Sequence, residues 1–459
     1  MKSVKSVHFS MRCEYLIVSL ICILGFVFYL WILTRHPLIY GIDGPYYLIQ
    51  VESLLETGSL EHGDPPLAFL IFALFTVLLR GDTTFGVRVG VSLFSAISAV
   101  PLYFLVKRIA HMKMAGYAAM LTSIFATPHT RMINDLLKNA VGVCFLLFFV
   151  YYLHELVFGE GTRRNLLLAS LFLVLTGATH ILDFGVALLF LGLYLSVAVL
   201  LDVNRRLVVK NLGAMFLVVG LFVIAAFAAF PSLFTDFFKG LYFLQDLFAA
   251  LGETAHPILF LFDPRGGALI MPILAIGFLL AVYEWRAGNK EAALALMAVA
   301  LIGLGLSFPL IPSEWLWRFL LMEFIPIAFI LGYCVSKMER KVAVTIFLLI
   351  AVFPVVIQGV EASRMMGPII NEKGYRELKA MKDVLPSDSV VVVEPRFMYW
   401  AEYILECDIA KRPSPSLWQS YTHVLGLFSK AKQPPFPIAR VLFNGEVFIL
   451  IEMRAAFPP

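Results

Sequence analysis

The stretch YLIVSLICILGFVFYLWILT, residues 15–34, runs for twenty residues without a charged side chain. A helix of that length rises about 30 Å, which is the thickness of the hydrocarbon core of a bilayer. Its apolar residues do not alternate with period two, and only helices and closed barrels satisfy their backbone in lipid. The stretch predicts a membrane-spanning helix. Since no small-residue cleavage site follows, we interpret it as an uncleaved first span.

The rest of the chain repeats this pattern. Its 459 residues are 60% hydrophobic and 15% charged, whereas soluble domains carry about a quarter charged residues. We therefore predict a polytopic α-helical membrane protein of about eleven spans. They lie at about 15–34, 88–106, 112–128, 136–157, 165–179, 182–201, 211–230, 267–284, 291–309, 318–335 and 341–359.

One apolar segment, PPLAFLIFALFTVLLR at 65–80, is expected not to cross. Its apolar part would reach only about 21 Å as a helix. If it crossed, every later basic loop would change sides relative to the basic N-terminus. We predict a helix that lies in, or dips into, the outer interface.

The short basic connections predict the orientation. With eleven spans, the five basic connections VKRIAHMK, EGTRRN, VNRRLVVK, EWRAGNK and SKMERK fall on the side of the N-terminal MKSVKSVHFSMR. The positive-inside rule makes that side cytoplasmic. The outer loops carry acids instead, among them Asp43, Glu52, Glu56, Glu61, Asp64, Asp135, Asp236, Asp246, Glu253, Asp263 and Glu314. Because no retention signal is present, a prokaryotic cell membrane is favoured over the endoplasmic reticulum.

The C-terminal segment changes composition and is expected to be extracytoplasmic. YRELKAMKDVL predicts an amphipathic helix, SVVVVE a buried strand and RFMYWAEYIL a second helix. RVLFNGEVFILIEM predicts a hairpin around Asn444-Gly445. We divide the chain into a transmembrane catalytic domain, 1–359, and a small α/β domain, 360–459.

The sequence does not indicate a nucleic-acid-binding surface, a zinc site or a disulfide framework. No arginine-rich stripe with interleaved aromatics is present, so we expect no nucleic-acid partner. The five cysteines are scattered, without a CxxC or Cys/His cluster that would indicate zinc or a disulfide framework.

Asp43 is the first candidate for chemistry. It follows the first span in GIDGPYY, and the run from Tyr46 to Thr57 predicts an amphipathic helix along the outer surface. Asp43 is either a catalytic base or metal ligand that faces a cavity, or a solvated acid that forms a turn before glycine.

The second candidate lies at the outer start of the fourth span, in TPHTRMINDLLKNAVG at 127–142. Arg131, Asp135, Lys138 and Asn139 recur at helical spacing, which would place them on one face. They either line a water-filled cavity or have simpler roles. In the second case Arg131 pairs with Asp135 and Lys138 extends to the interface.

Two further sites each allow a functional and a purely structural interpretation. His180 and Asp183 lie in a tight outer hairpin, where they either cap helix ends or bind a metal or phosphate. Arg318 stands beside Trp315 and Trp317 at the head of a span, and it either binds a lipid phosphate or anchors the helix. Glu323, deeper in that span, is expected to face the interior and to pair with Arg318.

In this order these segments resemble the GT-C superfamily of membrane glycosyltransferases, which includes the ArnT, protein mannosyltransferase and oligosaccharyltransferase group. The resemblance rests on DGPYYLIQVESLLETG after the first span, HGDPPLAFLIFALF, RVGVSLFSAISAVPLYFLVKRIA, RMINDLLKNAVG and WRFLLMEFIPIAFILG. The last is similar to the family's RYLLPxxPxxxxLxG pattern. Together they cover the membrane part of the chain, about 350 residues.

The resemblance implies a hexosyl or pentosyl transferase that takes sugar from a polyprenyl-phosphate or polyprenyl-diphosphate donor. The acceptor is a glycan, lipid or protein. Asp43 and Asp135 match the two catalytic outer-loop acids, and Arg318 matches the arginine that binds donor phosphate. Further implied substrate contacts are Arg131, Lys138, His180 and Tyr46. A divalent cation, Mg²⁺ or Mn²⁺, is an open part of this prediction, with Asp43, Asp135 and Asp183 as its candidate ligands.

The sequence also departs from the family. Asp43 is followed by Gly44 rather than by a second acid, which argues against the protein O-mannosyltransferase pattern. No WWDYG motif is present, and FMYWAEYI at 397–404 stands at a comparable position. This argues against a sequon-glycosylating oligosaccharyltransferase. The C-terminal domain is expected to close over the site or to bind the acceptor.

A polytopic transporter or lipid flippase is the alternative. The many spans and intramembrane Glu323 would suit one. Against it, the polar groups gather at the outer ends of spans rather than at the bilayer midplane, and no paired broken helices recur in matching halves.

Overall fold

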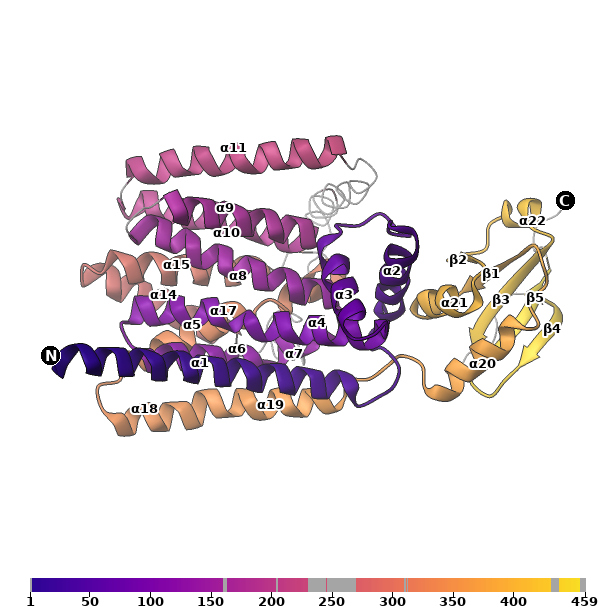
Figure 1. Cartoon of the computed structure of the whole chain (residues 1–459), viewed down its shortest axis with the longest axis horizontal. Helices are drawn as coiled ribbons and strands as arrows, with labels where there is room; N and C mark the ends of the chain where they lie inside the picture. Colours follow the sequence, from indigo (N-terminus) through magenta and orange to yellow (C-terminus); the bar gives the residue numbers. More distant parts are fainter. Residues whose placement is uncertain are drawn as a thin grey trace.

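The computed structural model describes residues 2–159, 163–203, 205–229, 245, 270–308, 311, 313–430 and 437–454. A bundle of long helices carries a small sheet domain at one end, and the N-terminus lies at the opposite end (Figure 1). The predicted outer acids Asp236, Asp246, Glu253 and Asp263 lie outside the described residues.

The described part of every predicted span is mainly helical, with interruptions at Ser98, Ala126 and 321–323. The helices are α1 (Lys2–Thr34), α4 (Thr83–Ile97) with α5 (Ala99–Ala110), α6 (Lys113–Phe125), α8 (Leu137–Phe158), α9 (Arg163–Thr179), α10 (Ile181–Leu200), α11 (Arg205–Ala229), α14 (Ile270–Arg286), α15 (Lys290–Leu306), α16 (Ser313–Leu320) with α17 (Phe324–Val335), and α18 (Lys341–Phe347) with η3 (Leu348–Val352) and α19 (Phe353–Arg364). Within the described part of the chain, six helical stretches are long and apolar enough to cross a membrane: Arg12–Thr34, Thr83–Ala110, Leu137–Phe158, Ile181–Leu200, Trp315–Val335 and Lys341–Arg364. The chain is a polytopic α-helical membrane protein, as predicted.

Prolines explain where two spans are interrupted. A proline ring clashes with the carbonyl four residues earlier and removes one helical hydrogen bond. Pro101 therefore disturbs the turn at Ile97, where α4 ends, and the helix resumes at Ala99 as α5. Before Pro354, the span widens into the π-helical turn η3, which accommodates the missing donor.

Three shorter helices cap the bundle: α2 (Gly44–Thr57), α3 (Leu67–Leu78) and α7 (Thr127–Asp135). Helix α2 matches the predicted surface helix, and α3 has 12 residues, which rise only about 18 Å. Figure 1 places α2 and α3 at the end of the bundle nearest the sheet domain. This arrangement agrees with the prediction that 65–80 does not cross.

The C-terminal domain contains α20 (Glu372–Lys382), β1 (Ser389–Val393), η4 (Pro395–Phe397), α21 (Met398–Leu405), β2 (Asp408–Ala410), α22 (Leu417–Ser420), β3 (His423–Ser429), β4 (Ile438–Asn444) and β5 (Phe448–Met453). Its strand order is β2-β1-β3-β5-β4, with β1 parallel to both neighbours and β5 antiparallel to both of its own. All five residues of β1 are buried, and β4 and β5 form the predicted hairpin. The α/β prediction for this domain is confirmed.

The hairpin is fastened to α20 through one side chain. The carboxylate of Glu377 accepts hydrogen bonds from the backbone N–H groups of Glu446, Val447 and Phe448, at 2.7–3.2 Å. The division at 359/360 stays a prediction. Helix α19 continues to Arg364 before the chain leaves the bundle.

Helix α21 joins the sheet domain to the cap of the bundle. Residues spaced three and four apart on α21 share a face, and that face meets the segment from α2 to the loop before α3. The ring of Tyr399 lies 5.0 Å from that of Tyr46. Glu402 Oε1 lies 2.7 Å from His62 Nε2. The Tyr403 hydroxyl donates to Glu52 at 3.1 Å.

Candidate functional site

Asp43 lies immediately before α2, and its side chain does not cap that helix. Burial raises the pKa of Asp43 above its usual value. Arg318 and Lys138 lower this pKa, whereas Asp135 and Asp64 raise it further. Four charged residues from separate segments therefore act on one half-buried carboxylate, which argues against the alternative of a solvated turn former.

Glycine at position 41 brings the first and second outer loops together. Gly41 has a φ of +77°, a conformation that favours glycine. A Cβ at this position would overlap the carbonyl oxygen of Asn134 and lie 3.4 Å from the Cα of Asp135. The close approach places Asp43, two residues after Gly41, beside the end of α7 that carries Asp135.

Lys138 does not extend freely towards the interface. Its ammonium pairs with the carboxylate of Asp64 and lies 5.9 Å from the centre of the Tyr46 ring. The Tyr46 hydroxyl donates to Asp64 at 2.6 Å. Tyr46 and Lys138, both predicted substrate contacts, therefore share one buried acid, since Asp64 is 1% exposed.

The prediction that four polar residues share one helix face is wrong. The helix breaks at Leu136, whose φ is −136° and ψ is 68°, so that α7 ends at Asp135 and α8 begins at Leu137. Arg131 and Asp135 remain together on α7 with a 4.0 Å separation of Nη2 and Oδ2. Lys138, beyond the break, reaches Asp64 instead.

His180, Asp183 and Asn139 form a buried cluster. His180 Nδ1 lies 3.6 Å from Asp183 Oδ2, and Asn139 donates to Asp183 Oδ1 at 3.3 Å. A Cβ at Gly142, one turn beyond Asn139, would overlap the Asp183 carboxylate. His180 precedes α10 but does not cap it with its side chain. The cluster adjoins the main site through Lys138, whose charge acts on Asp183.

Arg318 lies on α16 between two tryptophans. Its guanidinium carbon is 5.4 Å from the ring centre of Trp315 and 5.5 Å from that of Trp317. The expected pairing of Glu323 with Arg318 is not what the structure shows: Glu323 is fully buried and accepts a hydrogen bond from Ser307. One carboxylate oxygen of Glu323 is thus hydrogen-bonded within the bundle and the other has no partner in the described part of the chain, while Arg318 acts on Asp43.

The three predicted metal ligands do not form one group among the described residues. Among the described residues, no group of three His, Cys, Asp or Glu side chains is placed to hold a metal ion. Asp183 lies with Asn139 and His180 rather than with Asp43 and Asp135. Asp64 is engaged by a lysine. The predicted ligand set of Asp43, Asp135 and Asp183 is therefore not brought together, and a divalent metal ion stays a prediction.

Sequence reasoning did not assign a role to Asp64 or Gln50. Asp64 stands among several outer-loop acids, and only the following Pro65-Pro66 marks it as special. Gln50 is a polar residue of the amphipathic helix α2, and it is fully buried. Its amide donates to the His62 carbonyl and accepts from the His62 N–H, each at 2.9 Å.

Comparison with known proteins bears on this geometry. The family model of dolichyl-phosphate-mannose-protein mannosyltransferases matches residues 63–230, which include Asp64, Asp135, Lys138 and His180. The match begins after Asp43-Gly44, so it does not test the departure noted there. No curated protein sequence matches the chain.

Solved structures match over nearly the whole chain. One is the archaeal oligosaccharyltransferase AglB from Archaeoglobus fulgidus in complex with an inhibitory peptide and a dolichol-phosphate. It has a TM-score of 0.64 and 13% identity over 90% of this chain and 69% of its own. The structure of ArnT from Cupriavidus metallidurans in the apo state has a TM-score of 0.56 and 12% sequence identity. The match covers 97% of this chain and 98% of ArnT. The structure of ArnT bound to undecaprenyl phosphate has a TM-score of 0.53 and 12% sequence identity, and the match covers 96% of this chain and 98% of ArnT.

At these identities the structural matches establish the fold. AglB and ArnT are both GT-C glycosyltransferases, and the matched family model belongs to the same superfamily. The resemblance inferred from the sequence is thus confirmed: the chain has the fold of the GT-C membrane glycosyltransferases.

Proposed function

We propose that this protein transfers a sugar from a polyprenyl-phosphate or polyprenyl-diphosphate donor to a glycan, lipid or protein acceptor. The observation that carries the proposal is the convergence of Asp43, Asp135, Lys138 and Arg318 at the end of the bundle that bears the sheet domain. A carboxylate beside two cations is what transfer from a phosphate leaving group needs. The solved complexes of AglB with a dolichol-phosphate and of ArnT with undecaprenyl phosphate add support for a lipid-linked donor.

Asp43 serves as the general base. The acceptor oxygen attacks the anomeric carbon, the bond from that carbon to the phosphate oxygen breaks, and the acceptor proton passes to Asp43. A raised pKa makes a carboxylate a stronger base, and general bases work best with a pKa near the operating pH. Asp135 lies beside it as a second carboxylate that orients the acceptor hydroxyl. A single displacement of this kind inverts the anomeric centre.

The phosphate leaves with the bonding electron pair and needs positive charge already in place. Arg318 and Lys138 supply it. The guanidinium of Arg318 presents a planar fork suited to phosphate, and the flanking tryptophans limit its rotation. Arg131, His180 and Tyr46 complete the proposed substrate contacts.

The proposed orientation places this site outside a prokaryotic cell membrane and the N-terminus in the cytoplasm. Basic residues at the far end of the bundle, including Lys107, Arg108 and Lys337, support it through the positive-inside rule. A donor lipid in the outer leaflet would then reach the site from the side of the bundle.

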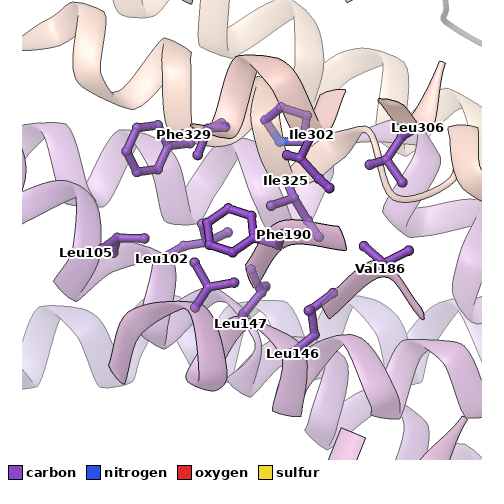
Figure 2. A pocket seen from close by; sticks show the side chains of 13 residues that line it. Leu102, Leu105, Leu146, Leu147, Val186, Phe190, Ile302, Leu306, Ile325 and Phe329 are labelled. Carbon is purple, nitrogen blue, oxygen red and sulfur yellow. The ribbon is translucent and has the colours of Figure 1, made fainter. Parts of the chain in front are cut away.

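The transporter alternative is not favoured by the interior of the described bundle. Figure 2 shows a cavity between α5, α8, α10, α15 and α17 that is lined only by apolar side chains, among them Leu102, Phe190 and Phe329. Its volume is ≈ 20 Å³, close to the minimum that holds one water molecule. This part of the bundle provides no polar route for a solute.

The test uses purified protein in lipid nanodiscs with a panel of radiolabelled polyprenyl-phosphate and polyprenyl-diphosphate sugars. Sugar release and transfer are followed for the wild type, Asp43→Asn and Arg318→Ala. Glu56→Gln and Arg376→Ala, which change exposed residues of α2 and α20, are the matched controls. Repeating the assay with EDTA and with added Mg²⁺ or Mn²⁺ determines whether a cation is needed.

Turnover by the wild type and both controls, lost in Asp43→Asn and Arg318→Ala, is the expected result and identifies the donor. Turnover that survives Asp43→Asn would remove that residue as the base. If no donor in the panel binds, the transporter becomes the better explanation.

A further inference from the structure

Asp64 is a buried carboxylate held on two sides. It stands directly before Pro65-Pro66, and only 1% of the residue is exposed. It accepts a hydrogen bond of 2.6 Å from the Tyr46 hydroxyl and forms an ion pair with Lys138. Both partners come from other segments: Tyr46 from α2 and Lys138 from the start of α8.

The loop that carries Asp64 is itself fixed by hydrogen bonds. Gln50 on α2 clamps the backbone of His62 through both its amide donor and its carbonyl. Gln50 also donates to the Tyr46 hydroxyl at 3.0 Å. Because Tyr46 in turn donates to Asp64, one chain of hydrogen bonds runs from the loop backbone through α2 to the carboxylate.

Stability alone does not account for this arrangement. A buried ion pair recovers little more than the cost of removing its charges from water, and apolar residues of similar volume are often as stable. What a fully satisfied polar network does provide is a fixed position for its members. The member that adjoins the proposed reaction site is Lys138, whose charge acts on Asp43.

We propose that Asp64 is a positioning residue, which holds the Lys138 ammonium beside the Tyr46 ring so that it meets the phosphate of the lipid-linked donor. The inference rests on the proposed function. An ammonium has three N–H donors, so one directed at Asp64 leaves two for phosphate oxygens. Without the carboxylate, the flexible lysine side chain would occupy many rotamers and would lose entropy on binding.

The experiment measures binding of the leaving group rather than turnover. Undecaprenyl phosphate and the uncharged undecaprenol are offered at equal mole fraction to wild-type protein in nanodiscs. Binding is followed by tryptophan fluorescence, since Trp315 and Trp317 flank Arg318. The variants are Asp64→Asn, Lys138→Met and the double variant, with Asp64→Glu as the conservative rescue.

Asp64→Asn is expected to weaken undecaprenyl phosphate binding by roughly 10- to 100-fold, the size of a lost charged hydrogen bond, without changing the response to undecaprenol. The double variant should bind no more weakly than Lys138→Met, because Asp64 acts through Lys138. Asp64→Glu should restore part of the affinity. Should Asp64→Asn fail to fold, Tyr46→Phe loosens the same carboxylate and is expected to weaken binding severalfold.

Each result decides between the two proposals. If the wild type binds phosphate and alcohol alike, both the proposed function and this inference are overturned. If the wild type prefers the phosphate but Asp64→Asn binds it equally well, the inference is overturned and the function stands. Additive losses in the double variant would likewise show that Asp64 does not act through Lys138.

Discussion

Charged side chains gather at both ends of the helical bundle, but their arrangement differs. At the end far from the sheet domain, Arg108 of α5 joins two other helices. Its guanidinium donates to both carboxylate oxygens of Glu155 at 2.6 and 2.7 Å and to Glu291 at 2.9 Å. His154 lies between Glu291, at 2.9 Å, and the Tyr194 hydroxyl, at 2.7 Å. Every member of this network has a close partner.

The same end holds a second closed network. Glu14 on α1 is 4% exposed. Its carboxylate forms ion pairs with Lys107 and with Lys113, the latter at 2.8 Å, and accepts a hydrogen bond from the Tyr103 hydroxyl at 2.8 Å. At the other end, no described residue forms an ion pair with Asp43 within 4.0 Å, although two cations and two acids act on it electrostatically. Closed networks fix helices. The set around Asp43 is open at that carboxylate, although Lys138 pairs with Asp64 and Asp135 with Arg131, and a carboxylate without an ion-pair partner is suited to a ligand.

The strongest expected effect tests whether the arrangement of charges around Asp43 depends on the close contact between Gly41 and Asn134. In Gly41→Ala the new Cβ would strike the Asn134 carbonyl and move Asp43 away from Asp135. A displacement of about 1 Å can lower a catalytic rate on the order of 10²-fold. Gly58→Ala is the matched control, because Gly58 also has a φ of +77° but no atom lies within 4 Å of its added Cβ.

Turnover in the nanodisc assay and thermal unfolding are measured for both glycine variants. Both should lose stability from the left-handed backbone, Gly41→Ala more because its Cβ also meets the Asn134 carbonyl, and only Gly41→Ala should lose turnover per folded molecule. Equal turnover in the two variants would show that the contact between the loops does not matter for catalysis.

The closed networks should behave in the opposite way. Arg108→Met leaves Glu155 and Glu291 without their shared cation. Because the Arg108 side chain is 31% exposed, the expected loss in the free energy of unfolding is about 1–2 kcal/mol, less than for a fully buried pair. Turnover per folded molecule should be unchanged, because the network lies at the other end of the bundle. Chemical unfolding in detergent, with exposed Arg164→Met as the control, measures the loss. A variant that is stable but inactive would mean that this end also serves the reaction.

A smaller effect is expected in the pH dependence. Asp43 must be ionised to act as a base, so activity falls as pH decreases through its pKa. Arg318 lowers that pKa, and its removal in Arg318→Gln should move the acid limb of the pH–rate profile to higher pH. The residual activity of this variant is compared with wild type and with exposed Arg376→Gln. An acid limb that stays in place would mean that Asp43 is not the titrating group.

The smallest effect concerns the contact between α21 and the cap. The hydrogen bond to Glu402 raises the pKa of His62, burial lowers it, and Glu61 and Asp64 raise it further. The ionic part of the contact is therefore present below the usual histidine pKa and is lost as pH rises through the raised value. Half-exposed ion pairs of this kind contribute little to stability. We therefore expect about a two- to fivefold change in the equilibrium for local opening of α21.

Hydrogen exchange of 398–405 at pH 6 and pH 8, corrected for intrinsic rates, measures this contact. The wild type should be more protected at pH 6, and His62→Gln should show no such difference. Equal pH dependence in both proteins would show that a group other than His62 titrates.

Much of the fold follows from local sequence. The spans are visible because lipid excludes unpaired backbone and charge, so twenty apolar residues leave few structural choices. The buried strand 389–393 and the Asn444-Gly445 hairpin follow from equally local rules. The order of the motifs is then enough to indicate the GT-C fold.

The site is only partly local. Asp43, Asp135 and Arg318 stand out because each is polar at the edge of an apolar run. The break at Leu136 does not stand out, and it changes which residues share a face. Glu323 shows the same limit: its burial is predictable, but its partner Ser307 follows the end of another helix, α15.

By itself, then, the sequence determined the membrane helices, the α/β domain and the candidate acids and cations, because hydrophobic length and turn chemistry act over a few neighbouring residues. Only the tertiary structure decided that Gly41 touches Asn134, that Asp64 holds Lys138 and that α21 meets α2. The hydrogen bond from Tyr403 of α21 to Glu52 of α2 joins residues 351 positions apart. Such pairings depend on how whole helices pack and where the chain returns, which no short stretch of sequence specifies.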